Sequence, residues 1–218
     1  MDRAVAKSCA HSVQRHIRAK GLRGVVFASC HYDIIDWLQP DWIFDTASGV
    51  LSARGSERRQ EIRLEVLPVS TQLWPRFRDH HYLSGDINRS ARCWVAEWEG
   101  VPVGFAAILA FPRAGLVNGW RGHRTVILPE FQGLGLGVRL SDAVGAIVTA
   151  DGGRYFSKTA SARMGEYRNK SPLWKPTTRN GQARPDYKAG RSTKEGKHKM
   201  RHAARVCYSH EFIGGSNA

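Results

Sequence analysis

The stretch that decides the fold runs His123-Arg-Thr-Val-Ile-Leu-Pro129, then Glu130-Phe-Gln-Gly-Leu-Gly-Leu-Gly137, then Val138-Arg-Leu-Ser-Asp-Ala-Val-Gly-Ala-Ile-Val-Thr-Ala150. The first segment is a short apolar run typical of a buried strand, and the last has apolar residues at helical spacing. The glycines between them form the turn. A helix that starts directly after such a turn leaves backbone N–H groups unpaired and favours an anion there. The stretch therefore predicts a phosphate cradle.

The spacing of the glycines limits which phosphate-containing ligands the cradle could bind. The stretch lacks the lysine of the phosphate loop Gly-x-x-x-x-Gly-Lys-Ser/Thr, and no acidic residue ends a second strand about 20 residues on, as dinucleotide binding requires. It does contain Gln-x-x-Gly-x-Gly, with Gln132, Gly135 and Gly137. In these residues the sequence resembles the GNAT superfamily of N-acetyltransferases. A tight glycine-rich turn without a ligand is the alternative.

Composition and charge set the class of protein. The chain has 218 residues, 42% of them hydrophobic, and a net charge of +14. We expect a cytoplasmic protein, because there is neither an apolar run long enough to cross a membrane nor a signal-peptide core. The four cysteines are scattered, which favours reduced thiols over disulfides or a zinc site. They are Cys9, Cys30, Cys93 and Cys207.

Most of the positive charge lies in residues 154–205, which carry fifteen lysines and arginines against three acidic residues. The phosphates of one cofactor need only a few of these charges, so a nucleic-acid partner is the simplest use for the rest. A solvated basic loop, at 175–205, is the alternative interpretation.

Residues 1–60 differ from the remainder. A helix over Ala4–Ile17, a buried strand over Val25–Cys30, His31, a short helix and a strand resemble the last part of an ABC-type ATPase domain. The resemblance implies that His31 stands at the switch-histidine position. Since the nucleotide-binding motifs are absent, we expect a truncated, catalytically silent remnant.

The order of expected elements in residues 61–218 is the acetyltransferase order. It consists of a strand at Ile62–Val66, a helix from Ser70 to Asp79, a hairpin at Glu99–Gly100, the cradle, a strand at Arg154–Thr159, a helix at Ser161–Asn169 and a strand at Arg205–Ile213. The predicted fold class is α+β, with a mixed, mostly antiparallel GNAT-like sheet flanked by helices and a small N-terminal α/β appendage.

The resemblance also implies the site. Acetyl-CoA, or another acyl-CoA, is the expected cofactor. Its acyl carbonyl and pantetheine arm would contact the backbone of Val126 and Leu128. Its pyrophosphate would bind the N–H groups of the cradle, which are those of Gln132, Gly133, Gly135, Leu136 and Gly137. The acyl group would pass directly to an acceptor nitrogen, so the enzyme mainly orients the reactants and stabilises the oxyanion.

Proton transfer needs an acid and a base. Tyr167, on the helix after the fifth strand, is the acid that the resemblance implies, and a packing role is equally open. For the base, His80-His81-Tyr82 is the candidate cluster, with His81 and Tyr82 as the catalytic pair. A metal site or a purely structural role is the alternative. The phrase His81-Tyr-Leu-Ser-Gly85 is also similar to one in phage Mom proteins, which modify adenine in DNA.

Overall fold

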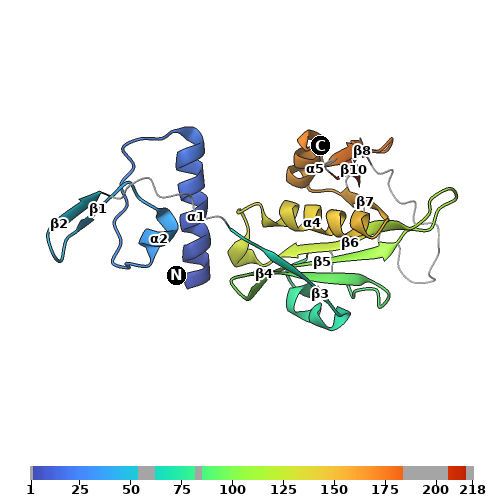
Figure 1. Ribbon diagram of the computed structural model, residues 1–218, viewed down its shortest axis with the longest axis horizontal. Helices are drawn as coiled ribbons and strands as arrows, with labels where there is room; N and C mark the ends of the chain where they lie inside the picture. The colour runs from blue at the N-terminus through green and yellow to red at the C-terminus, as the bar shows by residue number, and fades with distance from the viewer. Residues whose placement is uncertain (1, 54–61, 82–84, 184–205, 215–218) are drawn as a thin grey trace, which may run out of the picture.

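The computed structural model describes residues 2–53, 62–81, 85–183 and 206–214. Figure 1 shows two parts, an N-terminal part that begins with a long helix and a larger part built on a sheet. The elements of the N-terminal part are α1 (Arg3–Lys20), α2 (Ile34–Leu38), β1 (Trp42–Asp45) and β2 (Val50–Ala53).

The first helix begins and ends where its capping residues stand. The Asp2 carboxylate accepts hydrogen bonds from the N–H groups of Ala4 and Val5, which would otherwise lack partners. Gly21 ends the helix in the left-handed conformation, with a φ of 61°. The predicted helix at Ala4–Ile17 is confirmed and is longer by a few residues.

The predicted buried strand at Val25–Cys30 is wrong. This segment has no strand structure and is exposed, with 68% of Val26 and 50% of Phe27 accessible. An apolar run becomes a buried strand only where neighbouring strands pair with it. Among the described residues, the N-terminal part has only the β1–β2 hairpin, and that hairpin pairs with itself alone.

The larger part is built on a sheet with the strand order β3-β4-β5-β6-β7-β10-β8, and β9 pairs with β10. The strands are β3 (Glu65–Val69), β4 (Arg92–Trp98), β5 (Val101–Ala110), β6 (Gly119–Ile127), β7 (Arg154–Thr159), β8 (Trp174–Pro176), β9 (Gln182–Ala183) and β10 (Val206–Phe212). Of the strand pairs in the described residues, only β6–β7 is parallel. The predicted mixed, mostly antiparallel sheet flanked by helices is confirmed.

Most expected elements occur within a few residues of their predicted positions. Glu99 and Gly100, both with positive φ, form the turn of the β4–β5 hairpin. The predicted strand at Ile62–Val66 lies three residues later, as β3. The predicted helix from Ser70 is divided into a 3-10 turn, η1 (Thr71–Leu73), and α3 (Pro75–Arg78).

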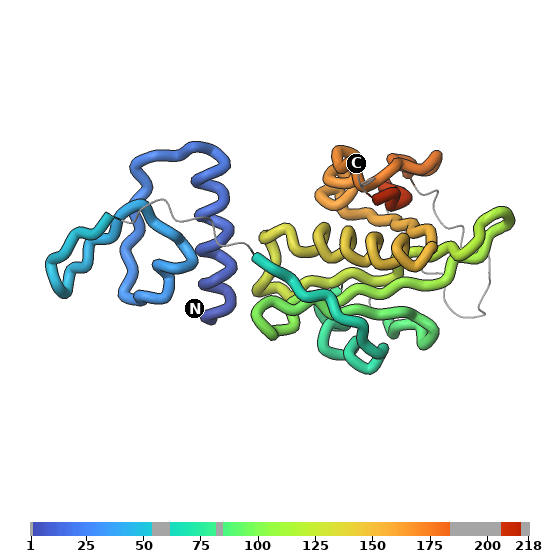
Figure 2. The backbone as a smooth tube through the Cα atoms, viewed as in Figure 1, coloured from blue at the N-terminus to red at the C-terminus, as the bar shows by residue number. Residues whose placement is uncertain are grey.

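Helices cover both faces of the sheet. The helix that follows the cradle, α4 (Leu136–Ala150), buries Leu140, Val144 and Val148 completely against one face. On the other face, Phe77 of α3 stacks on Phe105 of β5 with ring centroids 5.4 Å apart. Figure 2 follows the chain through this sandwich, with α4 above the central strands and α3 below them. The rigid core therefore lies directly under the cradle.

A buried polar cluster joins α4 to α5 (Ala162–Lys170) and β8. Asp142 accepts hydrogen bonds from the Tyr167 hydroxyl and from Nε1 of Trp174. Arg168, only 1% exposed, donates to the Ser141 hydroxyl and lies 4.3 Å from the Trp174 ring centroid. Trp174 therefore packs in the core, where it is only 4% exposed.

Buried His210 of β10 makes folding depend on pH. Its Nε2 lies 2.8 Å from Oδ1 of Asn169, and burial, aided by Arg168, lowers its pKa to about 4. The unfolded chain, with a histidine pKa near 6.5, binds this proton more readily. We predict that stability is full above pH 6.5 and is lost as pH falls from there to about 4. In His210→Gln the melting temperature should depend less on pH over this range, whereas exposed His16→Gln should keep the wild-type slope. An unchanged slope in His210→Gln would contradict this assignment.

Candidate active site

The site begins where two neighbouring strands part. β6 pairs with β7 only from Gly119 to Arg121, opposite Arg154–Phe156. Beyond that point β6 continues to Ile127 along β5, without a partner from β7. Gly122 stands at this fork, where an added Cβ would lie 3.0 Å from Oγ of Ser157 and 3.1 Å from the Tyr155 hydroxyl. The residues of β6 after Gly122 therefore offer one open edge.

The orientation of the peptide groups on this edge corrects the prediction for Val126 and Leu128. The N–H of Leu128 donates to the Val103 carbonyl, and its carbonyl accepts from Phe131. Val126, two residues before Leu128 on β6, pairs with Phe105 of β5. Backbone groups on an antiparallel strand alternate in direction from one residue to the next, so those of Val126, like those of Leu128, point toward β5. The backbone groups that face the open edge are those of Thr125 and Ile127. The sequence does not show which alternate residues of β6 direct their backbone groups toward β5 and which toward the open edge.

The cradle follows this edge and has the geometry that an anion needs. Gly133 and Gly135 have φ values of 88° and 78°, which residues with a Cβ rarely adopt. Gly135 is the N-cap of α4, and no side chain caps this helix. The first N–H groups of α4 therefore have no side-chain acceptor, and an anion can serve as one.

Gln132 connects the cradle to the open edge. Its side-chain amide donates to the carbonyl of Ile127 at 2.9 Å. This bond fixes the turn between the end of β6 and the start of α4. The Gln132 of the motif thus shapes the cradle with its side chain, which the sequence pattern alone did not reveal.

Aromatic and basic side chains gather on the side of β6 that carries α3. The rings of Trp74 and His81 meet edge to face with centroids 5.9 Å apart, and the Arg124 guanidinium lies 5.9 Å from the Trp74 ring. Trp74 Nε1 and Arg124 Nε are both buried without a hydrogen-bond partner. These two donors therefore lack an acceptor within the described part of the protein.

His123 is a site residue that the sequence analysis missed. The β5–β6 register shifts at Ala107/Ile108, so His123 is the extra residue of a β-bulge, a feature that redirects a side chain. Its ring accepts from the backbone N–H of Asn88. Burial, with Arg124, Arg121 and His81 nearby, lowers its pKa to about 4. The ring is therefore neutral at physiological pH. A bulge has no reliable pattern in a single sequence.

Of the remaining predicted residues, the structure describes some and not others. Tyr167 lies on α5 and donates its hydroxyl proton to Asp142, and burial together with Asp142 raises its pKa. Tyr82 lies outside the described residues, as do residues 184–205 of the basic segment. Within the described ranges, no group of three histidines, cysteines or acidic residues could hold a metal ion, and no helix is long and apolar enough to cross a membrane.

Comparison with known proteins supports the geometry. Residues 89–170 match the family model described as "Acetyltransferase (GNAT) domain". This segment runs from just before β4 to the end of α5 and includes the open edge, the cradle and Tyr167. The predictions of a GNAT-type domain and of an acetyltransferase are confirmed. No curated protein matches the chain.

Solved structures share the fold at low identity. A Bacillus subtilis acetyltransferase in complex with CoA is 13% identical, with a TM-score of 0.50, and the match covers 70% of this chain and 98% of that one. The ribosomal-protein-S18-alanine N-acetyltransferase from Escherichia coli is 11% identical, with a TM-score of 0.48, and 72% and 99% of the two chains are covered. The match to the Bacillus protein establishes the fold.

The cradle gives a direct prediction. Gly135→Glu should abolish the rise in melting temperature that acetyl-CoA produces, because a carboxylate at the helix start repels phosphate. Gly115→Glu is the matched control: Gly115 has a similar φ of 72° and also has nothing within 4 Å of an added Cβ. It carries the same backbone strain in the β5–β6 connection and should keep the full rise. Equal loss in both variants would argue against an anion at the cradle.

Proposed function

We propose that this protein transfers an acyl group from acyl-CoA to an amino group of a nucleic-acid base by direct attack. The observation that carries the acyl-CoA assignment is the uncapped start of α4 next to the open edge of β6. A phosphate site and a row of outward backbone groups, joined by Gln132, suit an extended cofactor with phosphates at one end.

Acetyl-CoA, or another acyl-CoA, supplies an activated thioester. In the proposed reaction the acceptor nitrogen forms a bond to the acyl carbon, the carbon–sulfur bond breaks, and the sulfur takes a proton. The cradle N–H groups hold the pyrophosphate. The backbone of Thr125 and Ile127 lines the pantetheine arm, in place of Val126 and Leu128. Orientation of the two reactants supplies most of the rate enhancement.

Three side chains are proposed for proton transfer. His81, with Tyr82 next to it, takes the proton that the attacking amine loses, because it lies beside Trp74 on the acceptor side. Tyr167 gives a proton to the leaving sulfur. For this role its hydroxyl must turn away from Asp142, its partner in the structure.

The acceptor is proposed from the donors on its side of the sheet. The unpartnered N–H groups of Trp74 and Arg124 suit the carbonyl oxygens and ring nitrogens of a base. The net charge of +14 favours a polyanion. Similarity of the His81–Gly85 phrase to Mom proteins supports the same acceptor. The alternatives are a protein or small-molecule amine, or a nucleic-acid-binding module without catalysis.

Residues 1–60 and 61–218 are proposed as two units, the first an ATPase-like remnant and the second the acyltransferase. The first unit lacks the lysine and acidic motifs that hold a nucleoside triphosphate with its magnesium ion. We therefore assign no ATP hydrolysis to it.

The assignment of His81 as the general base is tested by comparing substitutions at His81 and at its neighbour His80. His81→Gln should lower kcat about 10²-fold or more, in line with the usual contribution of a general base, and should leave acetyl-CoA binding unchanged. His80→Gln, at an exposed position one residue away, should keep the wild-type kcat. The measurement is product formation by mass spectrometry, since exposed Cys9 and Cys30 would react with thiol reagents. Equal kcat in the two variants would rule out His81.

The acceptor is tested by offering nucleic acids, peptides and polyamines with acetyl-CoA and identifying the product by mass spectrometry. We expect acylated nucleosides. Charge reversal at Lys194, Lys197 and Lys199 should weaken nucleic-acid binding for every sequence and flatten its salt dependence, because phosphate contacts release counterions. Acetyl-CoA binding should stay intact. Acylated peptides or amines without acylated nucleosides, or nucleic-acid binding unaltered by the reversal, would favour the alternatives.

A further inference from the structure

The N-terminal helix contacts the cradle itself. In α1, the Arg15 guanidinium donates a 2.7 Å hydrogen bond to the carbonyl of Leu134, in the middle of the glycine-rich turn. Ser12, on the same face, has its hydroxyl 3.7 Å from the position of a Cβ on Gly133. Arg15 and Ser12 lie outside the segment that matches the acetyltransferase model, residues 89–170, whereas their partners Leu134 and Gly133 lie inside it.

Further contacts hold this helix against the β4–β5 hairpin. Lys7 forms an ion pair with Glu99 at 2.6 Å and lies 4.3 Å from the ring centroid of Trp98. The His11 ring lies 5.3 Å from the same tryptophan, which in turn packs edge to face on Phe131. The helix is thus fixed at both ends of its contact with the larger part.

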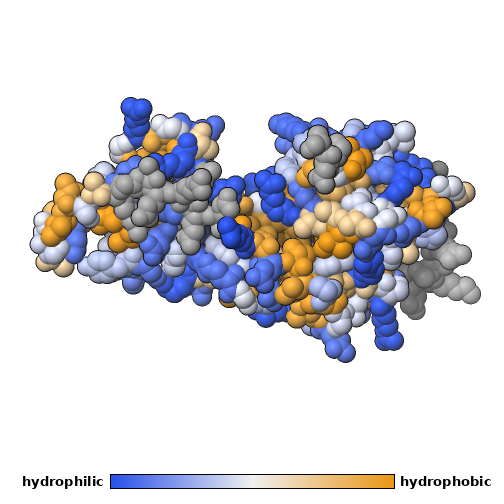
Figure 3. Space-filling model, viewed as in Figure 1, coloured by the Kyte–Doolittle hydropathy of each residue, from blue (hydrophilic) through white to orange (hydrophobic). Residues whose placement is uncertain are grey.

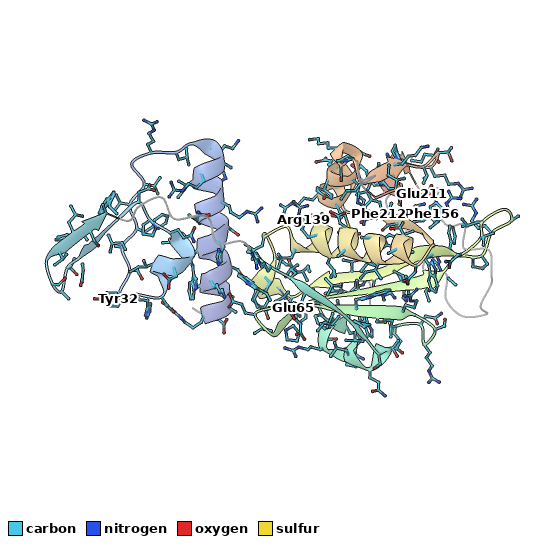
Figure 4. The ribbon with its side chains drawn as sticks, in the orientation of Figure 1. Tyr32, Glu65, Arg139, Phe156, Glu211 and Phe212 are labelled. Atoms are coloured by element: carbon cyan, nitrogen blue, oxygen red, sulfur yellow. The ribbon has the colours of Figure 1, made fainter. Side chains whose placement is uncertain are left out.

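Between α1 and the start of the cradle lies an open pocket of about 370 Å³, lined by Val5, Ser8, Cys9, Ser12, Pro129, Glu130 and Gln132. Ser8, one of these residues, is only 4% exposed, and its hydroxyl is buried without a hydrogen-bond partner. Figure 4 labels Arg139 in the first turn of α4, at the end of that helix that faces α1. Helix α1 therefore forms one side of the pocket next to the proposed phosphate site.

The bond from Arg15 selects one orientation of a peptide group. Leu134 stands between Gly133 and Gly135, both at positive φ, and glycine permits the peptide on either side to rotate. In a trans peptide the carbonyl and the following N–H point in opposite directions. By holding the Leu134 carbonyl toward α1, Arg15 directs the N–H of Gly135 away from it, so that this donor is in place before the phosphate arrives.

We propose that Arg15 of α1 is a positioning residue for the acyl-CoA phosphate loop, so that the N-terminal segment is part of the cofactor site. This inference rests on the proposed use of acyl-CoA. It also replaces the interpretation of residues 1–60 as silent with respect to this enzyme's own chemistry, whereas the proposed absence of ATP hydrolysis is unaffected.

The experiment compares Arg15→Ala, Arg15→Lys and Arg18→Ala. Arg18 lies one turn further along α1 and pairs with Asp41 at 2.6 Å, inside the N-terminal part, so it is a matched control. Loss of a hydrogen bond from a charged donor corresponds to about a tenfold weaker affinity. We expect this loss of acetyl-CoA affinity, by calorimetry, in Arg15→Ala, a partial loss in Arg15→Lys and none in Arg18→Ala.

A second substrate separates loop positioning from general damage. Acetyl-pantetheine lacks the pyrophosphate and the nucleoside, so its kcat/KM should be the same in the wild type and in Arg15→Ala. Unchanged acetyl-CoA affinity in Arg15→Ala would overturn the inference, as would equal losses for both substrates or an equal loss in Arg18→Ala. If the wild type itself does not bind acetyl-CoA, the proposed function fails, and that result is distinct from the others.

Discussion

The candidate site depends on one constraint, the end of pairing between β6 and β7 after three residues. Parallel strands that stay paired would satisfy each other's backbone groups and leave no room for a cofactor. Gly122 marks the fork, since a Cβ there would crowd Ser157 and Tyr155, and the bulge at His123 redirects β6 immediately afterwards. Because β5 holds the other edge of β6 along its whole length, the open edge is rigid as well as accessible. The hydrogen bond from the Gln132 side chain to the Ile127 carbonyl fixes the position of the cradle relative to this edge.

What the sequence predicted well is what local pattern determines. Helical spacing after Gly137, helical spacing over Ala4–Ile17 and the Glu99–Gly100 turn each depend on neighbours in the chain, and each is found. What it predicted poorly depends on partners far away. Val126 and Leu128 were assigned to the cofactor, but their backbone faces β5, because parity along β6 is fixed by register and shifted by a bulge. Val25–Cys30 reads as a buried strand, yet no strand of the described chain pairs with it. His123 could be recognised only once the bulge was seen.

The buried polar cluster explains why Tyr167 is hard to assign from sequence. Asp142, Arg168 and His210 place charged or titratable groups in a core that is mostly apolar, and burying such groups is costly unless they are hydrogen-bonded. The Tyr167 hydroxyl and the Trp174 indole satisfy Asp142, so they join α4, α5 and β8. The same tyrosine therefore stabilises the helix pair that borders the cradle. A loss of activity on its removal would mix structural and chemical effects, which is why the base, and not the acid, is the sharper test of mechanism.

The way in which α1 is attached sets a limit on its influence. The N-terminal part exposes large apolar side chains on the β1–β2 hairpin, where Trp42, Phe44, Val50 and Leu51 are all about half accessible or more; Figure 3 shows apolar side chains at this far end. Its contacts with the larger part include an ion pair, ring contacts, the packing of Ala4 on the core and the bond from Arg15 to Leu134. Exposed ion pairs contribute about 0–1 kcal/mol, so the Lys7–Glu99 pair adds little to this attachment. The helix can change cofactor affinity only by the energy of the bonds it makes to the loop. Binding of a phosphate that favours the same orientation of the Gly135 N–H must, by reciprocity, hold α1 more firmly.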